Sequence, residues 1–223
     1  MAQKRTAPTK QALRATPEVE DFAHKYTEEG QGKIGAKLLD NYFKHVEDLT
    51  FVSGVTGRKG AKAIEIGCGE GFSTQRLRAM LPKSVELSAS EYVKEMVPRA
   101  RKLNPGVKII EESIYETKHK DGEFDMIFLL EVLEHLDYPD QALQELARIL
   151  KKNGVLVLGV PREPLWRALN MARGKYLGAL GNTPGHLNRW SSLGIQRFVT
   201  KQFGPVEQAR NPLPWTLVLA KKK

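Results

Sequence analysis

Short apolar runs alternate with helical patterns through most of this chain, and this alternation limits the folds open to it. Five apolar runs of strand length lie at 61–66, 84–89, 107–112, 124–130 and 154–160. The clearest helix between them is 139–153, where apolar residues recur at helical spacing, with Pro139 near its start and Asn153-Gly154 at its expected end. Strands that alternate with helices predict βα units and a mostly parallel sheet.

The pattern changes after Val160. Residues 161–190 are basic, aromatic and rich in glycine and proline. A helix is then expected over 191–203, followed by strands at 205–210 and 214–220. Two strands joined by so few residues predict an antiparallel hairpin at the edge of the sheet. We therefore expect an α/β fold with seven strands, mostly parallel, with an antiparallel last strand and helices on both faces.

A single domain is expected over 18–223, because 223 residues suit one ordinary domain with small additions. Residues 1–17 are basic and contain no acid, which predicts a flexible arm, and 18–50 predicts two helices as a cap. A further helix is expected over 92–103, although Pro98 inside it should kink or shorten it.

Charge, cysteine content and apolar runs set the expected compartment and partners. The net charge is +9, but much of the excess lies in the arm and the C-terminal lysines, as in a protein with solvated basic tails. One cysteine excludes an intrachain disulfide, and no apolar run is long enough to span a bilayer. We expect a cytoplasmic protein with no membrane partner, and the sequence does not predict its oligomeric state.

The sequence AIEIGCGEGFST predicts a glycine-rich turn after the first strand. An acid, Glu65, precedes three alternate glycines, Gly67, Gly69 and Gly71. A dinucleotide site would require a glycine where Phe72 stands, and a phosphate loop would require a lysine followed by serine or threonine. The turn thus favours a ligand that is bound without either phosphate motif.

This acid-x-G-x-G-x-G pattern resembles the first motif of class I S-adenosylmethionine-dependent methyltransferases, and it looks like their type 11 or ubiquinone-pathway O-methyltransferase branch. The resemblance extends over residues 61 to about 160 and implies a Rossmann-like fold that binds S-adenosylmethionine. Glycines let the backbone approach the amino-acid end of that cofactor. The acid suits a cofactor that carries an ammonium and a sulfonium.

Later motifs carry the resemblance further. Glu91 ends the second strand, about 20 residues beyond the turn, where an acid can accept hydrogen bonds from ribose hydroxyls. Tyr92 and Met96 match the family frame, with glutamate in place of the usual aspartate. The resemblance also implies cofactor contacts at the positions Tyr26, Glu65, Gly67, Cys68, Gly69 and Leu130.

The adenine contact departs from the family pattern. The family often has an acid that binds the adenine amino group at the position assigned to Ser113. Either Ser113 takes that place or Glu112 supplies the acid. Ile114 would then pack on the base.

His135 is the candidate catalytic residue. It follows the fourth strand in the sequence DMIFLLEVLEHLDYP, which strongly resembles the family's fourth motif. Its ordinary pKa near about 6.5 suits removal of a proton from an acceptor hydroxyl. A purely structural role, as a cap of the turn, stays open.

A divalent metal site is the alternative. Glu131, Glu134 and His135 form E-x-x-E-H, and His186 follows later. Two carboxylates and two imidazoles could hold one ion, as in the ubiquinone-pathway and small-RNA 2′-O-methyltransferases that this pattern resembles. The same motif occurs widely in members without a metal, and the distance from His135 to His186 cannot be read from the sequence. We therefore prefer the general base.

Residues 161–190 are expected to form a substrate lid. Its members of interest are the cations Arg162, Arg167, Arg173, Lys175 and Arg189, the single acid Glu163, and the rings Trp166, Tyr176 and Trp190. They suit an acidic or aromatic small molecule, or stacked nucleic-acid bases. We expect methyl transfer to an oxygen of a small molecule. An RNA 2′-O-methyltransferase and a cofactor-binding module without turnover are the alternatives.

Overall fold

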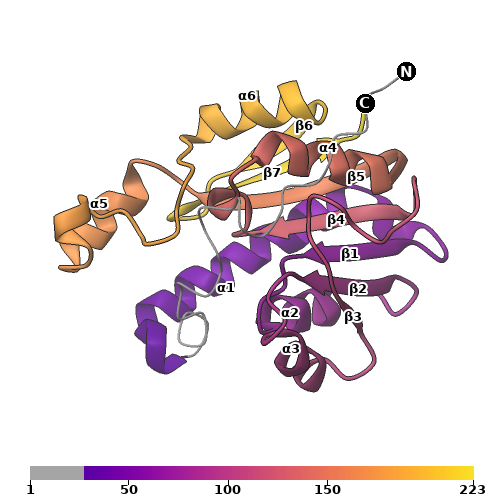
Figure 1. Cartoon of the computed structure of the whole chain (residues 1–223), viewed down its shortest axis with the longest axis horizontal. Coiled ribbons are helices and arrows are strands. Elements are labelled where there is room, and N and C mark those ends of the chain that lie inside the picture. The colour runs from indigo at the N-terminus through magenta and orange to yellow at the C-terminus, as the bar shows by residue number, and fades with distance from the viewer. Residues whose placement is uncertain (1–27) are drawn as a thin grey trace.

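A computed structural model describes the chain from residue 28 to residue 223, with side chains from residue 32 onward. Tyr26, the basic arm and the start of the predicted cap, residues 18–27, lie outside the described residues. The described strands form one seven-stranded sheet in the order β3-β2-β1-β4-β5-β7-β6 (Figure 1). They are β1 Lys62–Ile66, β2 Glu86–Glu91, β3 Lys108–Glu111, β4 Phe124–Leu130, β5 Leu150–Pro161, β6 Val206–Arg210 and β7 Trp215–Lys221.

The first five strands pair in parallel, and β7 runs antiparallel to both β5 and β6. The predicted α/β fold with an antiparallel end is therefore confirmed. The helices are α1 Glu28–Val52, α2 Phe72–Met80, α3 Val97–Leu103, α4 Pro139–Ile149, α5 Leu165–Ala172 and α6 Ser192–Gln202. Short 3-10 turns occur at η4 Val55–Gly57, η5 Leu133–His135 and η6 Leu177–Ala179. None of the described helices combines the length and the apolar character that a bilayer crossing requires.

Strand β4 explains why the sheet is covered on both faces. All seven of its residues are buried. Ile127 and Leu129 pack into the core under α4 and α6, whereas Met126 and Phe128 pack into the core under α1 and α2. A strand with two buried faces reads as a continuous apolar run, which is why its predicted bounds match the structure.

Two predicted helix boundaries are wrong. The helix expected over 92–103 begins only at Val97, and Pro98 lies in its first turn, where the missing N–H of proline costs no hydrogen bond. The helix expected to end at Asn153-Gly154 ends at Ile149. Asn153 has a left-handed backbone (φ 63°) and lies instead at an irregularity in the pairing of β5 with β4.

The sheet topology determines where a ligand can bind. From β1 the chain proceeds through β2 to β3 on one side, and it then returns to place β4 on the other side of β1. Ligands of open α/β sheets bind beyond the carboxyl ends of the strands at such a reversal. The turn after Ile66 and the residues after Leu130 meet at this edge.

Candidate active site

The glycine turn is held against the end of β2. The N–H groups of Gly67 and Cys68 both donate to the carbonyl of Ser90, at 2.9 and 3.0 Å. Gly67, Gly69 and Gly71 all have positive φ angles, of 76°, 54° and 89°. Only glycine adopts this conformation without steric cost, so the turn requires glycine at all three positions.

The three glycines differ in what surrounds them. A Cβ atom at Gly67 would lie 2.6 Å from the side chain of Val132, and one at Gly71 would lie 2.4 Å from the amide nitrogen of Asn104. A Cβ atom at Gly69 would meet no other atom within 4 Å. Gly67 and Gly71 are therefore needed for packing, and Gly69 is the one of the three that faces open space.

Glu65 lies beneath this turn and is only 1% exposed. The hydroxyl of Thr74 donates to its carboxylate at 2.5 Å, which joins β1 to the first turn of α2. Burial raises the pKa of Glu65 to about 7, and hydrogen bonds from Ser73 and Thr74 oppose that rise. A buried carboxyl with such a pKa gains its charge readily only when a cation lies nearby.

Glu91 supports the turn from the end of β2. One carboxylate oxygen accepts from the N–H of Gly69 at 2.7 Å, and the other accepts from the N–H of Val93 at 2.8 Å. Burial raises the pKa of Glu91, and these backbone donors oppose the rise. Each carboxylate oxygen has two lone pairs, so the group retains capacity for further donors such as hydroxyls.

The other residues predicted to contact the cofactor near this turn are Tyr92, Met96 and Cys68, and they differ in burial. Tyr92 and Met96 are half-buried, and Met96 stands just before α3. The side chain of Cys68 packs in the small core between α3 and the strands β2 and β3, and burial raises the pKa of its thiol. Cys68 therefore offers its backbone, not its thiol, to a ligand in the turn.

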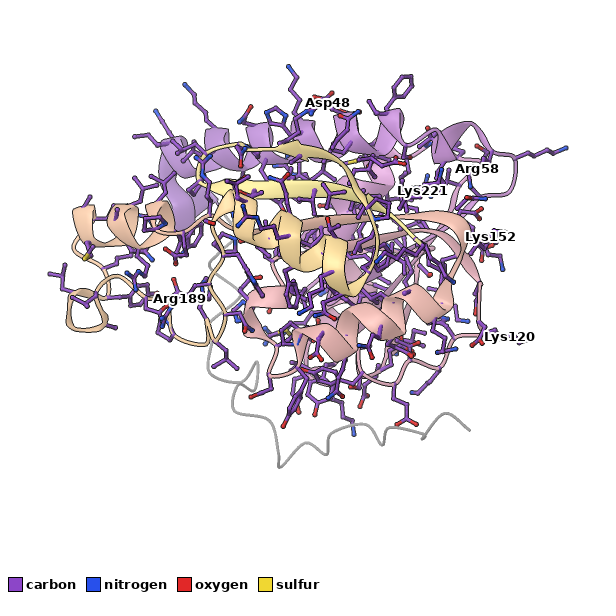
Figure 2. The ribbon with its side chains drawn as sticks, turned by 90° about the horizontal axis from the view of Figure 1, so that it is seen from above. Asp48, Arg58, Lys120, Lys152, Arg189 and Lys221 are labelled. Atoms are coloured by element: carbon purple, nitrogen blue, oxygen red, sulfur yellow. The ribbon has the colours of Figure 1, made fainter. Side chains whose placement is uncertain are left out.

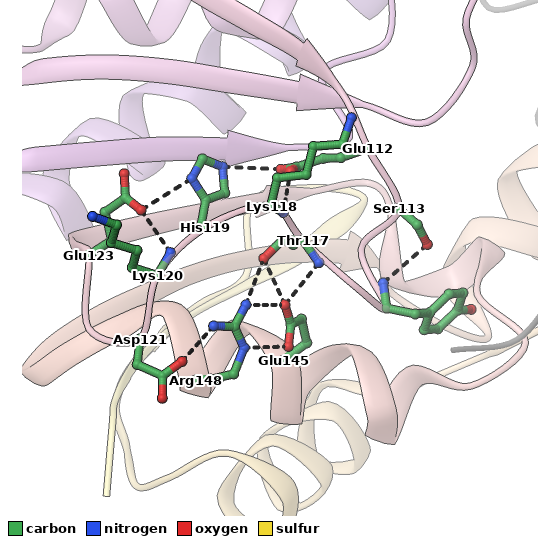
Figure 3. Close-up of polar contacts among 11 residues, drawn as sticks. Glu112, Ser113, Thr117, Lys118, His119, Lys120, Asp121, Glu123, Glu145 and Arg148 are labelled. Carbon is green, nitrogen blue, oxygen red and sulfur yellow. Dashed lines mark hydrogen bonds and ion pairs between the residues drawn. The ribbon is translucent and has the colours of Figure 1, made fainter. Parts of the chain in front are cut away.

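Figure 3 shows the loop after β3, which contains Glu112 and Ser113, the two alternatives for the adenine contact. The carboxylate of Glu112 accepts from the N–H of Lys118 at 2.9 Å and lies 3.2 Å from Nε2 of His119. Burial opposes its charge, but these two partners outweigh burial and lower the pKa of Glu112. Both oxygens of Glu112 are thus engaged within its own loop. Ser113 is half-buried, with Oγ accepting from the N–H of Tyr115, and it remains the candidate.

Two further residues of the predicted cofactor set are core residues. Ile114 is buried in the core under α4, and Leu130 is buried at the end of β4. The next residue, Glu131, has a left-handed backbone with φ 58°, which is uncommon for a residue with a side chain. Its carboxylate accepts from the indole N–H of Trp215 at 2.7 Å.

The turn after β4 brings Glu134, His135 and His186 together. One potential ligand atom from each lies within 4.8 Å of the others. Glu134 is 1% exposed, and its carboxylate lies 3.8 Å from Nε2 of His135. The rings of His135 and His186 stand edge to face at 4.9 Å. The structure therefore unites three of the four predicted metal ligands, whereas Glu131 does not belong to this group and contacts Trp215.

Backbone hydrogen bonds position both histidines. The carbonyl of Glu134 accepts from the N–H groups of Leu187 and Asn188, at 2.9 and 3.0 Å. These bonds hold the loop segment that contains His186. Nδ1 of His135 lies 3.2 Å from the carbonyl of Gly185. Because a carbonyl can only accept, this contact favours the tautomer with the proton on Nδ1, which leaves the lone pair on Nε2.

An aromatic cluster covers this site. Trp166 stacks on His186 with centroids 6.1 Å apart and lies 5.9 Å from Trp215, which in turn lies 4.9 Å from Tyr42. Trp166 was predicted to line the lid. Tyr42 and Trp215 were missed, because no motif marks them and they come from the two ends of the domain. A Cβ at Gly159 would lie 2.1 Å from the hydroxyl of Tyr42, so that glycine is the sequence signal for the close approach of Tyr42.

The other lid residues lie elsewhere. Trp190 packs against Phe198 of α6, with ring centroids 5.5 Å apart. Tyr176 is exposed. Three of the lid cations have partners within the lid: Arg167 pairs with Glu163, Arg173 donates to Asn170 and Arg189 donates to Asn182.

Residues 64–158 match a family model described as a methyltransferase domain. A probable S-adenosylmethionine-dependent methyltransferase from Mycobacterium tuberculosis is 26% identical over 132 residues, which cover 59% of this chain and 47% of that protein. A ubiquinone biosynthesis O-methyltransferase from Xanthomonas oryzae is 27% identical over 141 residues, covering 59% of this chain and 56% of that protein.

The chain spans between 33% and 56% of the length of the curated relatives that it matches. Among solved structures, a SAM dependent methyltransferase from Aquifex aeolicus superposes with a TM-score of 0.64 at 20% identity. That match covers 79% of this chain and 89% of the other.

Proposed function

We propose that this chain is a class I S-adenosylmethionine-dependent methyltransferase and that it transfers a methyl group to an oxygen of an aromatic small molecule. The observation that carries the proposal is the convergence of Glu134, His135 and His186 at the carboxyl end of β4, beside the glycine turn. Both groups of residues lie at the edge of the sheet where the strand order reverses.

The residues of the turn fit S-adenosylmethionine. Gly69 faces open space, the buried carboxyl of Glu65 favours a nearby cation, and Glu91 retains lone pairs for hydroxyl donors. These residues, with Ser113 on the next strand end, would hold the cofactor. When bound, the cofactor supplies an electrophilic methyl group on a sulfonium. The chain itself must align the acceptor, exclude water and accept a proton.

His135 is the residue that would accept that proton. Its side chain is 16% exposed, and its favoured tautomer leaves Nε2, which is buried beside Glu134, as the proton acceptor. The Glu134 carboxylate beside Nε2 would stabilise the imidazolium that forms. A hydroxyl acceptor requires such a base more than a neutral amine does, which supports oxygen as the nucleophile.

The same cluster also fits a divalent cation. One carboxylate and two imidazoles form a donor set that suits zinc, manganese or iron. The unknown distance to His186 was one of two reasons to prefer a simple base, and the ring centroids of His135 and His186 lie 4.9 Å apart. The other reason, that the motif also occurs in members without a metal, still stands. A bound cation would lower the pKa of an acceptor hydroxyl. His135 would then act as a ligand, and Glu131 would not.

The aromatic cluster supports an aromatic acceptor over an acidic one. The half-buried rings of Trp166 and Trp215 offer apolar surface beside His186, and the buried ring of Tyr42 packs against Trp215. Of the lid cations, Arg167 pairs with Glu163, which reduces the charge available to an anion, whereas Arg173 and Arg189 donate to neutral amides and keep their charge. A relative named as a ubiquinone biosynthesis O-methyltransferase agrees with a phenolic acceptor.

The test is methyl transfer from labelled S-adenosylmethionine to a panel of phenols and catechols, with amines and single-stranded RNA as parallel acceptors. We expect label on the phenols, and loss of transfer in His135→Ala. Label only on RNA would replace the small-molecule assignment. Cofactor binding without transfer to any acceptor class would favour a binding module.

A further inference from the structure

A hairpin built on α5 projects from the body of the molecule. Residues 164–185, here called the α5 hairpin, leave the end of β5, form α5 and η6, and return toward His186. Figure 1 shows this hairpin extending beyond the edge of the sheet, away from α2, α3 and α4. Figure 2 places Arg189 beside it, at the opposite end of the molecule from Lys120 and Lys152.

Side-chain hydrogen bonds join the two arms of the hairpin at its base. Asn170 is buried, and its side-chain amide donates to the carbonyl of Gly181 at 2.9 Å and to the hydroxyl of Thr183 at 3.1 Å. The indole of Trp166 donates to the same hydroxyl at 2.9 Å. A Cβ at Gly181 would lie 2.2 Å from the carbonyl oxygen of Arg167, so the two arms touch. These contacts fix the base of the hairpin, so residues 171–180, here called the tip, project from a hydrogen-bonded base.

The tip presents apolar side chains to solvent. All ten residues of 171–180 are exposed. They include Met171, Tyr176, Leu177 and Leu180, whose exposed fractions run from 38% to 67%. Tyr176 and Leu180 also adopt left-handed backbone angles, with φ of 54° and 49°. Conformations that bulky residues avoid persist where the surrounding structure imposes them, and they are frequent at functional sites.

The surroundings of the tip are positively charged. Arg173 and Lys175 lie within the exposed stretch, and the sequence has no acid between Glu163 and Glu207. Long apolar side chains with flanking cations and no acid are the pattern that inserts into the interface of an anionic bilayer. We propose that the α5 hairpin docks the protein on an anionic lipid surface.

Other occupants fit less well. A second copy in a symmetric contact would place these cations against the same cations. Nucleic-acid bases stack on flat rings, and Tyr176 is the single aromatic residue within 171–180. A lipid surface requires neither symmetry nor rings. It also requires no spanning helix, because the tip would enter only to the depth of the headgroups. The proposal thus differs from the expectation of no membrane partner.

The experiment is co-sedimentation of the full chain with vesicles of phosphatidylcholine alone, or with about a third phosphatidylserine. We expect binding to the anionic vesicles that falls at high salt. The double variant Leu177→Ser and Leu180→Ser should lower the partition coefficient about tenfold or more. Arg173→Gln and Lys175→Gln should each lower it about fivefold. Phe51→Ser on α1, which is 77% exposed and outside the hairpin, is the matched control and should bind as wild type.

The variants change exposed side chains, so their melting temperatures should equal that of the wild type and folding cannot explain a loss. Failure to sediment with anionic vesicles would overturn the proposal, as would binding that is insensitive to the tip variants. Equal loss in Phe51→Ser would also overturn it. Light scattering that shows a dimer lost in the Leu177 and Leu180 variant would assign the tip to a second copy instead. None of these outcomes depends on methyl transfer.

Discussion

The carboxylate of Glu91 accepts a hydrogen bond from the backbone N–H of Gly69, at 2.7 Å. This bond joins the end of β2 to the one glycine of the turn that faces open space. Glu91 therefore shapes the turn, and we expect its remaining lone pairs to accept from a ligand.

Glu91→Ala should weaken binding of S-adenosylmethionine by about 1.5–3 kcal/mol, the range for a hydrogen bond to a charged group. The loss should show in calorimetric titration of folded protein. Glu91→Gln is the control, because an amide oxygen can still accept from Gly69 while the charge is gone. Equal affinity in the alanine variant and the wild type would remove Glu91 from the cofactor site.

Gly67 and Gly69 should respond differently to substitution. Gly69→Ala should cost about 1–2 kcal/mol of stability for its left-handed backbone and should block cofactor binding, because its side chain enters open space. Gly67→Ala should lower the melting temperature further, since its Cβ would collide with Val132.

The matched control is Val132→Ala in the Gly67→Ala background. Removing the colliding methyl groups should recover part of the lost stability, which thermal melting can measure. The same Val132→Ala change should not rescue Gly69→Ala. Rescue of both variants, or of neither, would contradict the assignment of separate neighbours.

The buried Glu65 should make stability depend on pH. Burial raises its pKa from 4.5 to about 7 in the folded protein. Between these values the folded state holds a proton that the unfolded state has released, so the free energy of unfolding falls as the pH rises toward 7. Above that pH the loss is complete, on the order of 3 kcal/mol.

Glu65→Gln keeps an oxygen that can accept from Thr74 and removes the titration. The free energy of unfolding of both proteins is measured with denaturant between pH 5 and pH 8. The difference between wild type and variant isolates the contribution of this carboxyl from that of the other groups with shifted pKa. This difference in the free energy of unfolding should decline as the pH rises and should level off above about pH 7. A flat difference would mean that Glu65 is already charged in the folded protein.

The sequence predicted those parts of the fold and the site that depend on residues close together in the chain. Strand β4 matched its predicted bounds because burial of both faces leaves a local signature. The start of α3 was missed because Tyr92 belongs to the turn that Glu91 organises, a local preference that helical spacing does not record. Glu91 and the glycine turn could be placed since their motif is short and local.

The aromatic part of the site could not be predicted. Tyr42 and Trp215 meet there only because α1 and β7 both pack next to β5, a contact between distant segments. The sequence spacing of Glu131 to Glu134 suggested two equal ligands. Glu131 has a left-handed backbone, which the sequence does not reveal, and its carboxylate accepts a hydrogen bond from Trp215 instead.

The cluster of Glu134, His135 and His186 separates two mechanisms. If His135 is the general base, His135→Ala should lower turnover by roughly 10²–10⁴ with cofactor affinity nearly intact. Activity of the wild type should then rise with pH through the pKa of that histidine. His186→Ala and Glu134→Gln should have smaller effects, because they act on the base through its surroundings.

If instead the three residues hold a divalent cation, all three variants should share one large defect. A chelator should remove the activity of the wild type, and an added divalent ion should restore it. Glu131→Gln is the matched control in both cases, since its carboxylate accepts from Trp215 and Glu131 is not a member of the three-residue cluster. A melting-temperature shift without a turnover defect in His135→Ala would leave the residue structural. Direct metal analysis of the purified wild type and of His186→Ala gives a second readout, because only the metal mechanism predicts that stoichiometric metal is lost in the variant.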